Sequence, residues 1–171
     1  MTDFRPLILT ARPDAATLAR FETLRRQHFP PALNRVPAHI SLFHHLPGSE
    51  LDAVVARLKL AAREHPRPGV EATGYRSLGR GVALTLRSPG LAALHADLAG
   101  AWEPLLIPQD RARYAAHVTV QNKVTPAEAR TTLVLLQAGF APFAFPIVAV
   151  DVWRYLDGPW AAVGSVALRP A

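Results

Sequence analysis

The stretch His39-Ile40-Ser41-Leu42 decides how the rest of the chain is interpreted, and His117-Val118-Thr119-Val120 repeats its pattern later in the sequence. Each tetrapeptide has the form His, apolar, hydroxyl, apolar. Because side chains alternate between the faces of a strand, each predicts an imidazole and a hydroxyl on one face and two buried apolar side chains on the other. Two such strands lining one groove would place two titratable bases and two hydroxyl donors around a small anion.

The length and composition predict one folded domain, residues 1–171, with either one full core or two small lobes that share one. A chain of 171 residues is long enough for one full hydrophobic core but too short for two ordinary domains. Half of the residues are hydrophobic and 19% are charged, which argues against a disordered chain. The absence of cysteine excludes disulfides, thiolate nucleophiles and cysteine-bound zinc.

The sequence predicts a soluble, cytoplasmic protein, which we expect to be a monomer. The stretch from Met1 to Pro6 lacks the basic end and long apolar run of a signal peptide. No apolar run reaches the ~18–20 residues of a membrane span. The formal net charge of +6 fits an anionic partner such as RNA, although the basic residues are scattered and form no nucleic-acid tail.

Apolar periodicity places the motifs within an alternation of strands and helices. A strand over residues 4–10 and a helix over 14–28 are predicted before the first motif. Ser49 is the predicted N-cap of the helix that follows this motif, and Thr125 that of the helix that follows the second. A further helix is predicted to begin at Ser88-Pro89. The remaining strands are predicted to form two hairpins, 69–78 with 82–87 and 145–155 with 160–168.

The two halves of the chain have the same order of elements, because each motif strand is followed by a capped helix and then by a hairpin. We therefore predict an α+β fold with two lobes related by a pseudo-twofold axis. Antiparallel sheets would line a central groove, with the helices packed outside. A doubly wound parallel sheet is the alternative for alternating strands and helices. The two hairpins argue against it, as does the lack of a Gly-rich phosphate loop after a strand.

The residue types of the two motifs suit the chemistry of a phosphodiester. That reaction needs a base for the nucleophile, an acid for the departing oxygen and donors for the non-bridging oxygens. Two imidazoles can fill the first two roles, because histidine titrates near neutral pH. The hydroxyls of Ser41 and Thr119 could bind the non-bridging oxygens. A single such histidine is more often an ordinary strand residue, so the prediction depends on the doubled pattern.

The doubled motif resembles the His-x-Thr/Ser-x signature of the two-histidine phosphoesterases. The flanks, Val36-Pro37-Ala38 and Gln109 to Tyr114, resemble the 2′-5′ RNA ligase-like branch of that superfamily. The resemblance implies two lobes around a groove and metal-independent attack on a 2′,3′-cyclic phosphate, or the reverse 2′-5′ ligation. The partner it implies is an RNA end or a small nucleotide with a cyclic phosphate, and no cofactor is expected.

The resemblance also implies roles for the motif residues. His39 and His117 carry over as the acid and base, and Ser41 and Thr119 as phosphate-oxygen donors. Ser41 stands where the family more often has threonine. Ala115-Ala116 stands where the family often has a proline before the second histidine.

Six further residues are candidates for contacting the substrate. Strand alternation allows only one of two adjacent histidines to share the face of His39, and His45 is the candidate. Two polar residues extend the second motif strand, two arginines lie in the loops before the motif strands, and one aromatic residue could stack on a base. For each of them, ordinary surface exposure or core packing is the competing explanation. These five residues are Gln121, Lys123, Arg35, Arg113 and Tyr155.

No metal site is predicted, because the sequence has no His-x₃-His pair and no carboxylate cluster near the histidines. The favoured function is a metal-independent phosphodiesterase that opens 2′,3′-cyclic phosphates on RNA ends or small nucleotides. Which histidine is the acid cannot be read from the sequence. One alternative is a binding module that holds an RNA end or nucleotide without turnover. Another is a hydrolase of the same chemistry acting on a cyclic phosphate of ADP-ribose.

Overall fold

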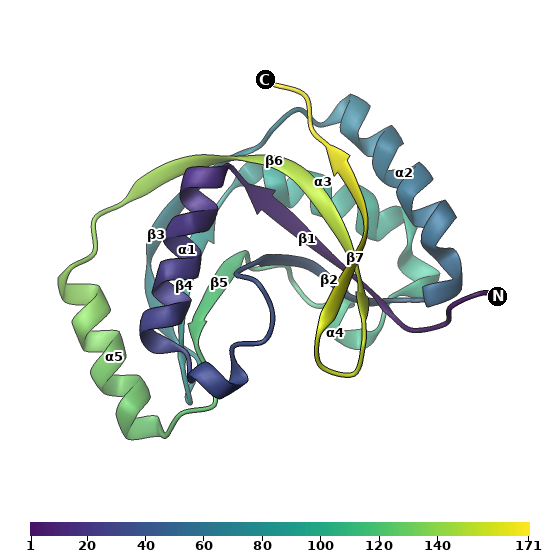
Figure 1. Cartoon of the computed structure of the whole chain (residues 1–171). Coiled ribbons are helices and arrows are strands. Elements are labelled where there is room, and N and C mark those ends of the chain that lie inside the picture. Colours follow the sequence, from purple (N-terminus) through teal and green to yellow (C-terminus); the bar gives the residue numbers. More distant parts are fainter.

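The computed structural model describes all of residues 1–171 and contains a seven-stranded antiparallel sheet that curls around a central space (Figure 1). The helices lie on the outside of the curl. The strands are β1 Leu7–Pro13, β2 Ile40–Leu46, β3 Gly69–Ser77, β4 Val82–Arg87, β5 His117–Gln121, β6 Phe143–Tyr155 and β7 Trp160–Ala167. The helices are α1 Ala15–His28, α2 Leu51–Glu64, α3 Pro89–Ala101, the short α4 Pro108–Arg111 and α5 Pro126–Ala138. The predicted α+β class is confirmed.

The two motif strands stand at opposite ends of the strand order. That order is β2-β1-β6-β3-β4-β5, with β7 added alongside β6. The long strand β6 joins two halves of the sheet, because residues 143–146 pair with β3 and residues 147–154 pair with β1. Since the sheet curls, its end strands β2 and β5 approach each other at the centre of the molecule.

The chain runs twice through the order strand, helix, strand, helix, strand. The first pass is β1-α1-β2-α2-β3 and the second is β4-α3-β5-α5-β6, with the short α4 inserted between α3 and β5 and β7 added at the end. Helix α1 follows β1 but packs against β5 in the other half of the sheet. Helix α5 packs against β3 and β4, and α2 packs against β7 and α3. Both predicted hairpins form, β3 with β4 and β6 with β7.

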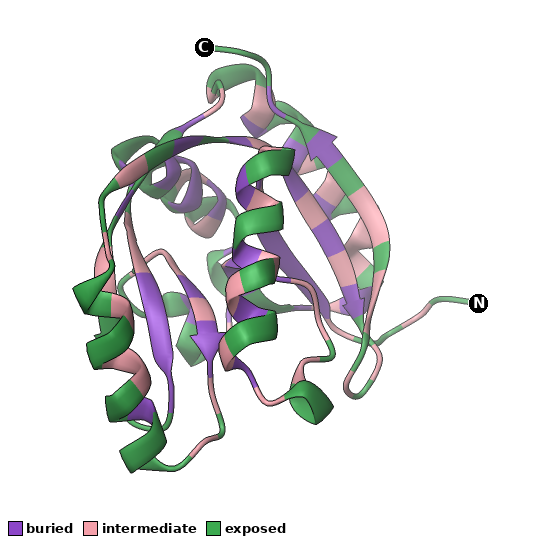
Figure 2. Cartoon of the chain, turned by 60° about the vertical axis from the view of Figure 1, so that its left-hand side comes forward, coloured by how far each residue is buried: buried purple, intermediate pink, exposed green.

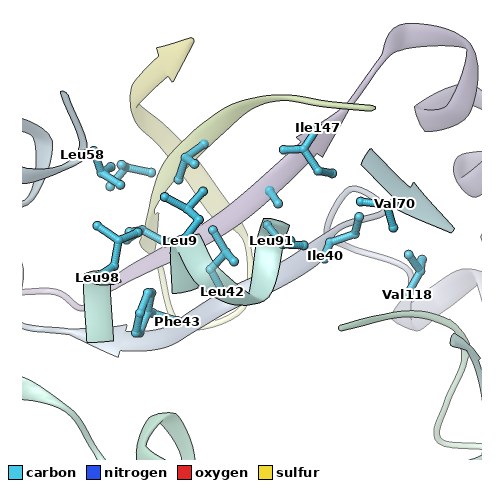
Figure 3. Packing of buried hydrophobic residues seen from close by; sticks show 14 of the residues in the cluster. Leu9, Ile40, Leu42, Phe43, Leu58, Val70, Leu91, Leu98, Val118 and Ile147 are labelled. Carbon is cyan, nitrogen blue, oxygen red and sulfur yellow. The ribbon is translucent and has the colours of Figure 1, made fainter. Parts of the chain in front are cut away.

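The apolar halves of the two motifs lie in one continuous core (Figure 3). Ile40 and Leu42 of β2 and Val118 and Val120 of β5 are buried, as the alternation predicted. Burying a side chain of this size contributes about 1.5–3 kcal/mol. The polar halves of both motifs are therefore held against the central space by the packing behind them.

The helix caps were predicted correctly at two of three places. Thr125 forms the complete capping box with Glu128, and the Ser88 hydroxyl accepts a hydrogen bond from the Leu91 amide. The predicted cap at Ser49 is wrong. Residues Gly48–Glu50 form a 3₁₀ turn instead, and α2 begins at Leu51 without a side-chain cap.

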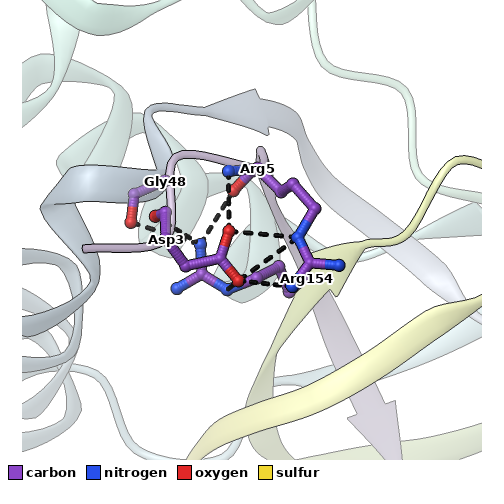
Figure 4. A network of polar contacts seen from close by, with 4 residues as sticks. All are labelled: Asp3, Arg5, Gly48 and Arg154. Carbon is purple, nitrogen blue, oxygen red and sulfur yellow. Dashed lines mark hydrogen bonds and ion pairs between the residues drawn. The ribbon is translucent and has the colours of Figure 1, made fainter. Parts of the chain in front are cut away.

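The Gly48 turn is held by a buried arginine of β6 (Figure 4). Arg154 donates from Nη1 to the carbonyls of Asp3, Arg5 and Gly48 at 2.9, 2.8 and 3.3 Å. A Cβ at position 48 would collide with the Arg5 carbonyl, so this close approach requires glycine. The first strand was predicted over residues 4–10; it starts at Leu7 because the residues before it bend around Arg154.

The outer faces of α1 and α5 are exposed, while the strands beneath them are buried (Figure 2). Helix α5 contributes one buried side chain, Ala129, and leaves Val134 and Leu135 exposed. None of the helices combines the length and apolar character that a membrane span requires.

Candidate active site

Both motif histidines line a single cavity of about 160 Å³ between β2 and β5. The hydroxyl residues of the two motifs line it as well, so four residues distant in sequence meet there as the alternation predicted. Three further residues complete the wall. The lining residues are Ile8, His39, Ser41, His44, His117, Thr119 and Trp160.

The two motif imidazoles are oriented by the same hydrogen bond. His39 Nδ1 donates to the carbonyl of Pro37 at 2.8 Å, and His117 Nδ1 donates to the carbonyl of Ala115 at 2.9 Å. A carbonyl can only accept, so Nδ1 carries the proton in both rings. Each Nε2 is therefore the atom that can exchange a proton with a ligand in the cavity.

The surroundings of His39 favour its neutral form. Its ring packs against the Trp160 indole with 4.7 Å between ring centroids. Burial is the main cause that lowers the pKa of His39 to about 4; the hydrogen bond to Pro37 opposes this shift, and the coulombic effect of Arg25, His44 and His117 adds to it. At neutral pH the free His39 ring can thus accept a proton.

The hydroxyls of Ser41 and Thr119 are free, while their backbone carbonyls are held from the opposite half of the chain. Neither hydroxyl hydrogen-bonds another group of the protein. Tyr114 donates its phenolic hydrogen to the Ser41 carbonyl at 3.0 Å, and Arg25 Nη1 donates to the Thr119 carbonyl at 2.9 Å. These two bonds fix the motif backbones and leave the hydroxyls available to a phosphate.

Helix α1 holds both motif strands through two side chains three residues apart, which share one helix face. Glu22 accepts a hydrogen bond from the Ala38 amide at 2.7 Å, next to His39. Arg25, which is buried, donates to Thr119 and to the Asn34 side chain and lies over the Phe29 ring. Neither role was apparent in the sequence.

A stack of three rings joins α3 to the first motif strand, β2. The His95 ring lies between Phe43 of β2 and Tyr114, with centroid separations of 4.7 and 4.1 Å and nearly parallel planes. Burial lowers the pKa of His95 and raises that of Tyr114, so both groups are neutral near pH 7. The stack thus fixes the Tyr114 hydroxyl on the Ser41 carbonyl.

The structure places His44, and not the predicted His45, in the cavity with His39. The pairing of β1 with β2 shifts register between Thr10, which faces Ser41, and Leu9, which faces Phe43. This irregularity interrupts the alternation, so the next residue that faces the cavity is His44. The His45 side chain is exposed and does not line the cavity.

A buried carboxylate fixes His44. Asp110 of α4 accepts the backbone amides of His44 and His45 at 2.9 and 3.0 Å, and its Oδ1 accepts His44 Nδ1 at 2.8 Å. Burial acts to raise the pKa of Asp110, but these hydrogen bonds lower it below its usual value. The polar stretch before the second motif strand thus contains a buried positioning group.

Of the other predicted contact residues, only Arg113 lies beside the cavity, in the wall of an adjoining one. Gln121 turns to the opposite side of β5 because a register shift follows Thr119, and its amide donates to Thr132 at 2.8 Å. Lys123 is exposed, in the turn after β5, with a φ of 63°. Arg35 is exposed and binds the Ala32 carbonyl, and Tyr155 is exposed and lines neither cavity.

One group of three side chains has ligand atoms close enough to hold a metal ion, and it lies away from the histidine cavity. It consists of Glu64, His65 and Asp97. Both oxygens of Asp97 are already bound, by Arg57 at 2.6 Å and by His65 at 3.0 Å. The ring nitrogens of His39, His44 and His117 do not form such a group.

Residues 13–159 match the sequence pattern of the 2′-5′ RNA ligase superfamily. The chain belongs to this superfamily. The match includes both motif strands and all five helices, and the superfamily has two-histidine phosphoesterase-type activity. No curated protein is significantly similar to the chain.

Solved structures share the fold of this superfamily member at low sequence identity. TT0787 of Thermus thermophilus has a TM-score of 0.67 and 18% identity, over 96% of this chain and 98% of that chain. LigT of E. coli, solved with NADP+, has a TM-score of 0.61 and 16% identity, over 97% and 99%. A structure described as a phosphoesterase has a TM-score of 0.59 and 17% identity, over 98% and 99%.

Proposed function

We propose that the protein is a metal-independent phosphodiesterase that opens 2′,3′-cyclic phosphates on RNA ends or small nucleotides. The observation that carries the proposal is the shared cavity, in which two imidazoles with fixed Nδ1–H tautomers stand beside two unengaged hydroxyls. Membership of the 2′-5′ RNA ligase superfamily supports the substrate class. LigT has been solved with ATP, with 3′-AMP and with phosphate, which supports nucleotide and phosphate ligands here.

In the proposed reaction a water oxygen forms a bond to phosphorus while one ribose P–O bond of the cyclic phosphate breaks. His39 Nε2 accepts the proton of the attacking water, because the lowered pKa keeps this ring neutral before the reaction. His117 enters the reaction as the imidazolium, with Nδ1–H held by the Ala115 carbonyl, and gives its Nε2 proton to the departing ribose oxygen, which leaves it neutral. In 2′-5′ ligation the two roles are exchanged, since the reverse reaction passes through the same transition state.

Ser41 and Thr119 have a separate role in this proposal. Their hydroxyls donate to the non-bridging oxygens, on which negative charge accumulates as the water attacks. The hydrogen bonds from Tyr114 and Arg25 to the carbonyls of these two residues limit how far each backbone can move. Removing one such donor commonly costs about 10²–10³-fold in kcat.

The test is hydrolysis of nucleoside 2′,3′-cyclic phosphates and of cyclic-ended oligonucleotides in the presence of EDTA, with the product isomer identified. We expect turnover in the chelator, and a loss of about 10²–10⁴-fold in kcat for His39→Ala and for His117→Ala. Arg130→Ala, on the exposed face of α5, is the control and should match the unaltered protein. Abolition of activity by EDTA would reject the metal-independent mechanism, and undiminished turnover in either histidine variant would remove that residue from it.

The alternative is a module that binds an RNA end or nucleotide in the same cavity without turnover. Tight binding of a cyclic nucleotide with no product after long incubation would favour it. A cyclic phosphate of ADP-ribose belongs in the same substrate panel, because its hydrolysis needs the same proton transfers.

A further inference from the structure

A second cavity of about 150 Å³ adjoins the histidine cavity. The two share three lining residues, Ser41, His44 and His117, so they lie side by side. The wall of the second cavity also contains Arg76 of β3 and Arg113 of the loop before β5. It thus combines residues of four separate chain segments, β2, β3, α3 and the stretch from α4 to β5.

His44 stands at the junction of the two cavities with one ring nitrogen free. Its Nδ1 is bound to Asp110, and no protein group hydrogen-bonds its Nε2. The side chain is 41% exposed, so the ring is accessible from the cavities. An imidazolium at this position can donate Nδ1–H to Asp110 and Nε2–H to an oxygen anion at the same time.

The second cavity offers free donors to an anion. Arg76 and Arg113 are exposed, and neither guanidinium makes an ion pair or hydrogen bond within the protein. The one carboxylate in the wall is Asp110, whose oxygens already accept the His44 amide, the His45 amide and His44 Nδ1. The charge balance of the unengaged groups is therefore positive.

We propose that this second cavity, with His44, Arg76 and Arg113, is a subsite for a second phosphate group of the substrate. The inference rests on the proposed function. With the cyclic phosphate between His39 and His117, the nearest further phosphate of an RNA end is the one on the 5′ oxygen of the same nucleoside. The subsite makes the protein prefer a 5′-phosphorylated nucleotide or an oligonucleotide end over a nucleoside 2′,3′-cyclic phosphate. Asp110 is the positioning residue that aims His44 at this phosphate.

A binding experiment tests the subsite without turnover. Nucleoside 3′,5′-bisphosphate and nucleoside 3′-monophosphate are titrated into the unaltered protein, and we expect the bisphosphate to bind about tenfold more tightly, since its second phosphate gains charge-assisted hydrogen bonds. Arg76→Ala and Arg113→Ala, whose side chains line the second cavity and not the histidine cavity, should each lower this ratio while leaving the affinity for the 3′-monophosphate unchanged. Arg130→Ala, which also removes one positive charge, should leave the ratio intact. Equal affinities in the unaltered protein, or an unchanged ratio in both subsite variants, would overturn the proposal.

A kinetic experiment separates this proposal from the proposed function. The substrates are a nucleoside 2′,3′-cyclic phosphate with a free 5′ hydroxyl and the same compound with a 5′ phosphate. We expect a KM about tenfold lower for the phosphorylated form, and Arg113→Ala should raise that KM with little change in kcat. A binding ratio near tenfold without turnover of either compound would reject the proposed function and keep the subsite. Turnover of both with equal KM would reject the subsite and keep the function.

Discussion

His39 and His117 make the same hydrogen bond to a carbonyl two residues earlier, but their surroundings differ. His39 lies against Trp160 and loses its hydration, which penalises the imidazolium form. A substrate phosphate would bring negative charge next to the ring and favour the imidazolium again. The proton that His39 accepts during the reaction is thus stabilised by the substrate rather than by the protein.

This asymmetry can be measured by NMR titration of the histidine rings. In the free protein we expect His39 to titrate with a pKa of about 4, because burial disfavours its charged form. If His39 is the base, kcat/KM should fall as the pH drops through that value, since the free protein then becomes protonated at Nε2. Added phosphate should raise the pKa of His39. A midpoint near 6.5 in the free protein would contradict the expected effect of burial on the His39 ring. Trp160→Ala exposes this ring, so the substitution should raise the pKa of His39.

The sequence predicted that the four motif residues share a cavity, whereas it placed His45 rather than His44 beside the first motif. Periodicity alone assigns His45 to the face of His39, whereas the register shift between β1 and β2 brings His44 to the cavity. Such an irregularity depends on how two strands pair, and residue alternation within one strand carries no signal for it. Asp110 escaped prediction for a related reason, because its partner His44 lies 66 positions away.

At the scale of elements, helix α1 covers the sheet and also binds the backbone of both motifs. Its residues Glu22 and Arg25 reach the backbone of both motif strands, next to His39 and at Thr119. Amphipathic spacing predicts which helices form and which faces they bury. Helix α1 and both hairpins form as the sequence predicted. The sequence gives no sign that polar side chains of α1 bind the motif strands, because the carbonyl that Arg25 binds is 94 positions away.

The substitution Arg25→Met tests the role of the hydrogen bond between Arg25 and the Thr119 carbonyl of the second motif. It removes the donor to Thr119 and Asn34 while keeping an unbranched side chain in the space. We expect a loss of about 1–3 kcal/mol in the free energy of unfolding for each acceptor that stays buried without a partner. In the folded variant kcat should fall more than KM rises, because the Thr119 hydroxyl is less well placed for the charged transition state.

Arg26→Met is the matched control for this experiment. Arg26 is exposed and bonds only the nearby Thr23 side chain. Its replacement should change the unfolding free energy by less than about 0.5 kcal/mol, as surface substitutions usually do. A kcat of Arg25→Met equal to that of the control would mean that α1 stabilises the fold without positioning Thr119.

At the scale of the whole molecule, β6 makes the two halves of the sheet interdependent. It pairs with β3 at its start and with β1 and β7 further along, and one hydrophobic cluster extends across both halves. The cavity exists only when β2 and β5, at the two ends of the strand order, are both in place. A half that unfolded separately would remove one histidine from the cavity.

We therefore expect a single cooperative unfolding transition. Tryptophan fluorescence reports on Trp153 and Trp160 of the β6–β7 hairpin and on Trp102, which packs against Phe43 of β2. Amide hydrogen exchange of β4 and β5 reports on the other half of the sheet, and the two probes should give the same midpoint. Arg154→Leu, which strips a donor from three carbonyls near the N-terminus, should lower the midpoint by the same amount for both probes. A variant in which the fluorescence transition moves while the exchange of β4 and β5 does not would show two independent lobes. In that case the cavity would depend on their association, because its walls come from both.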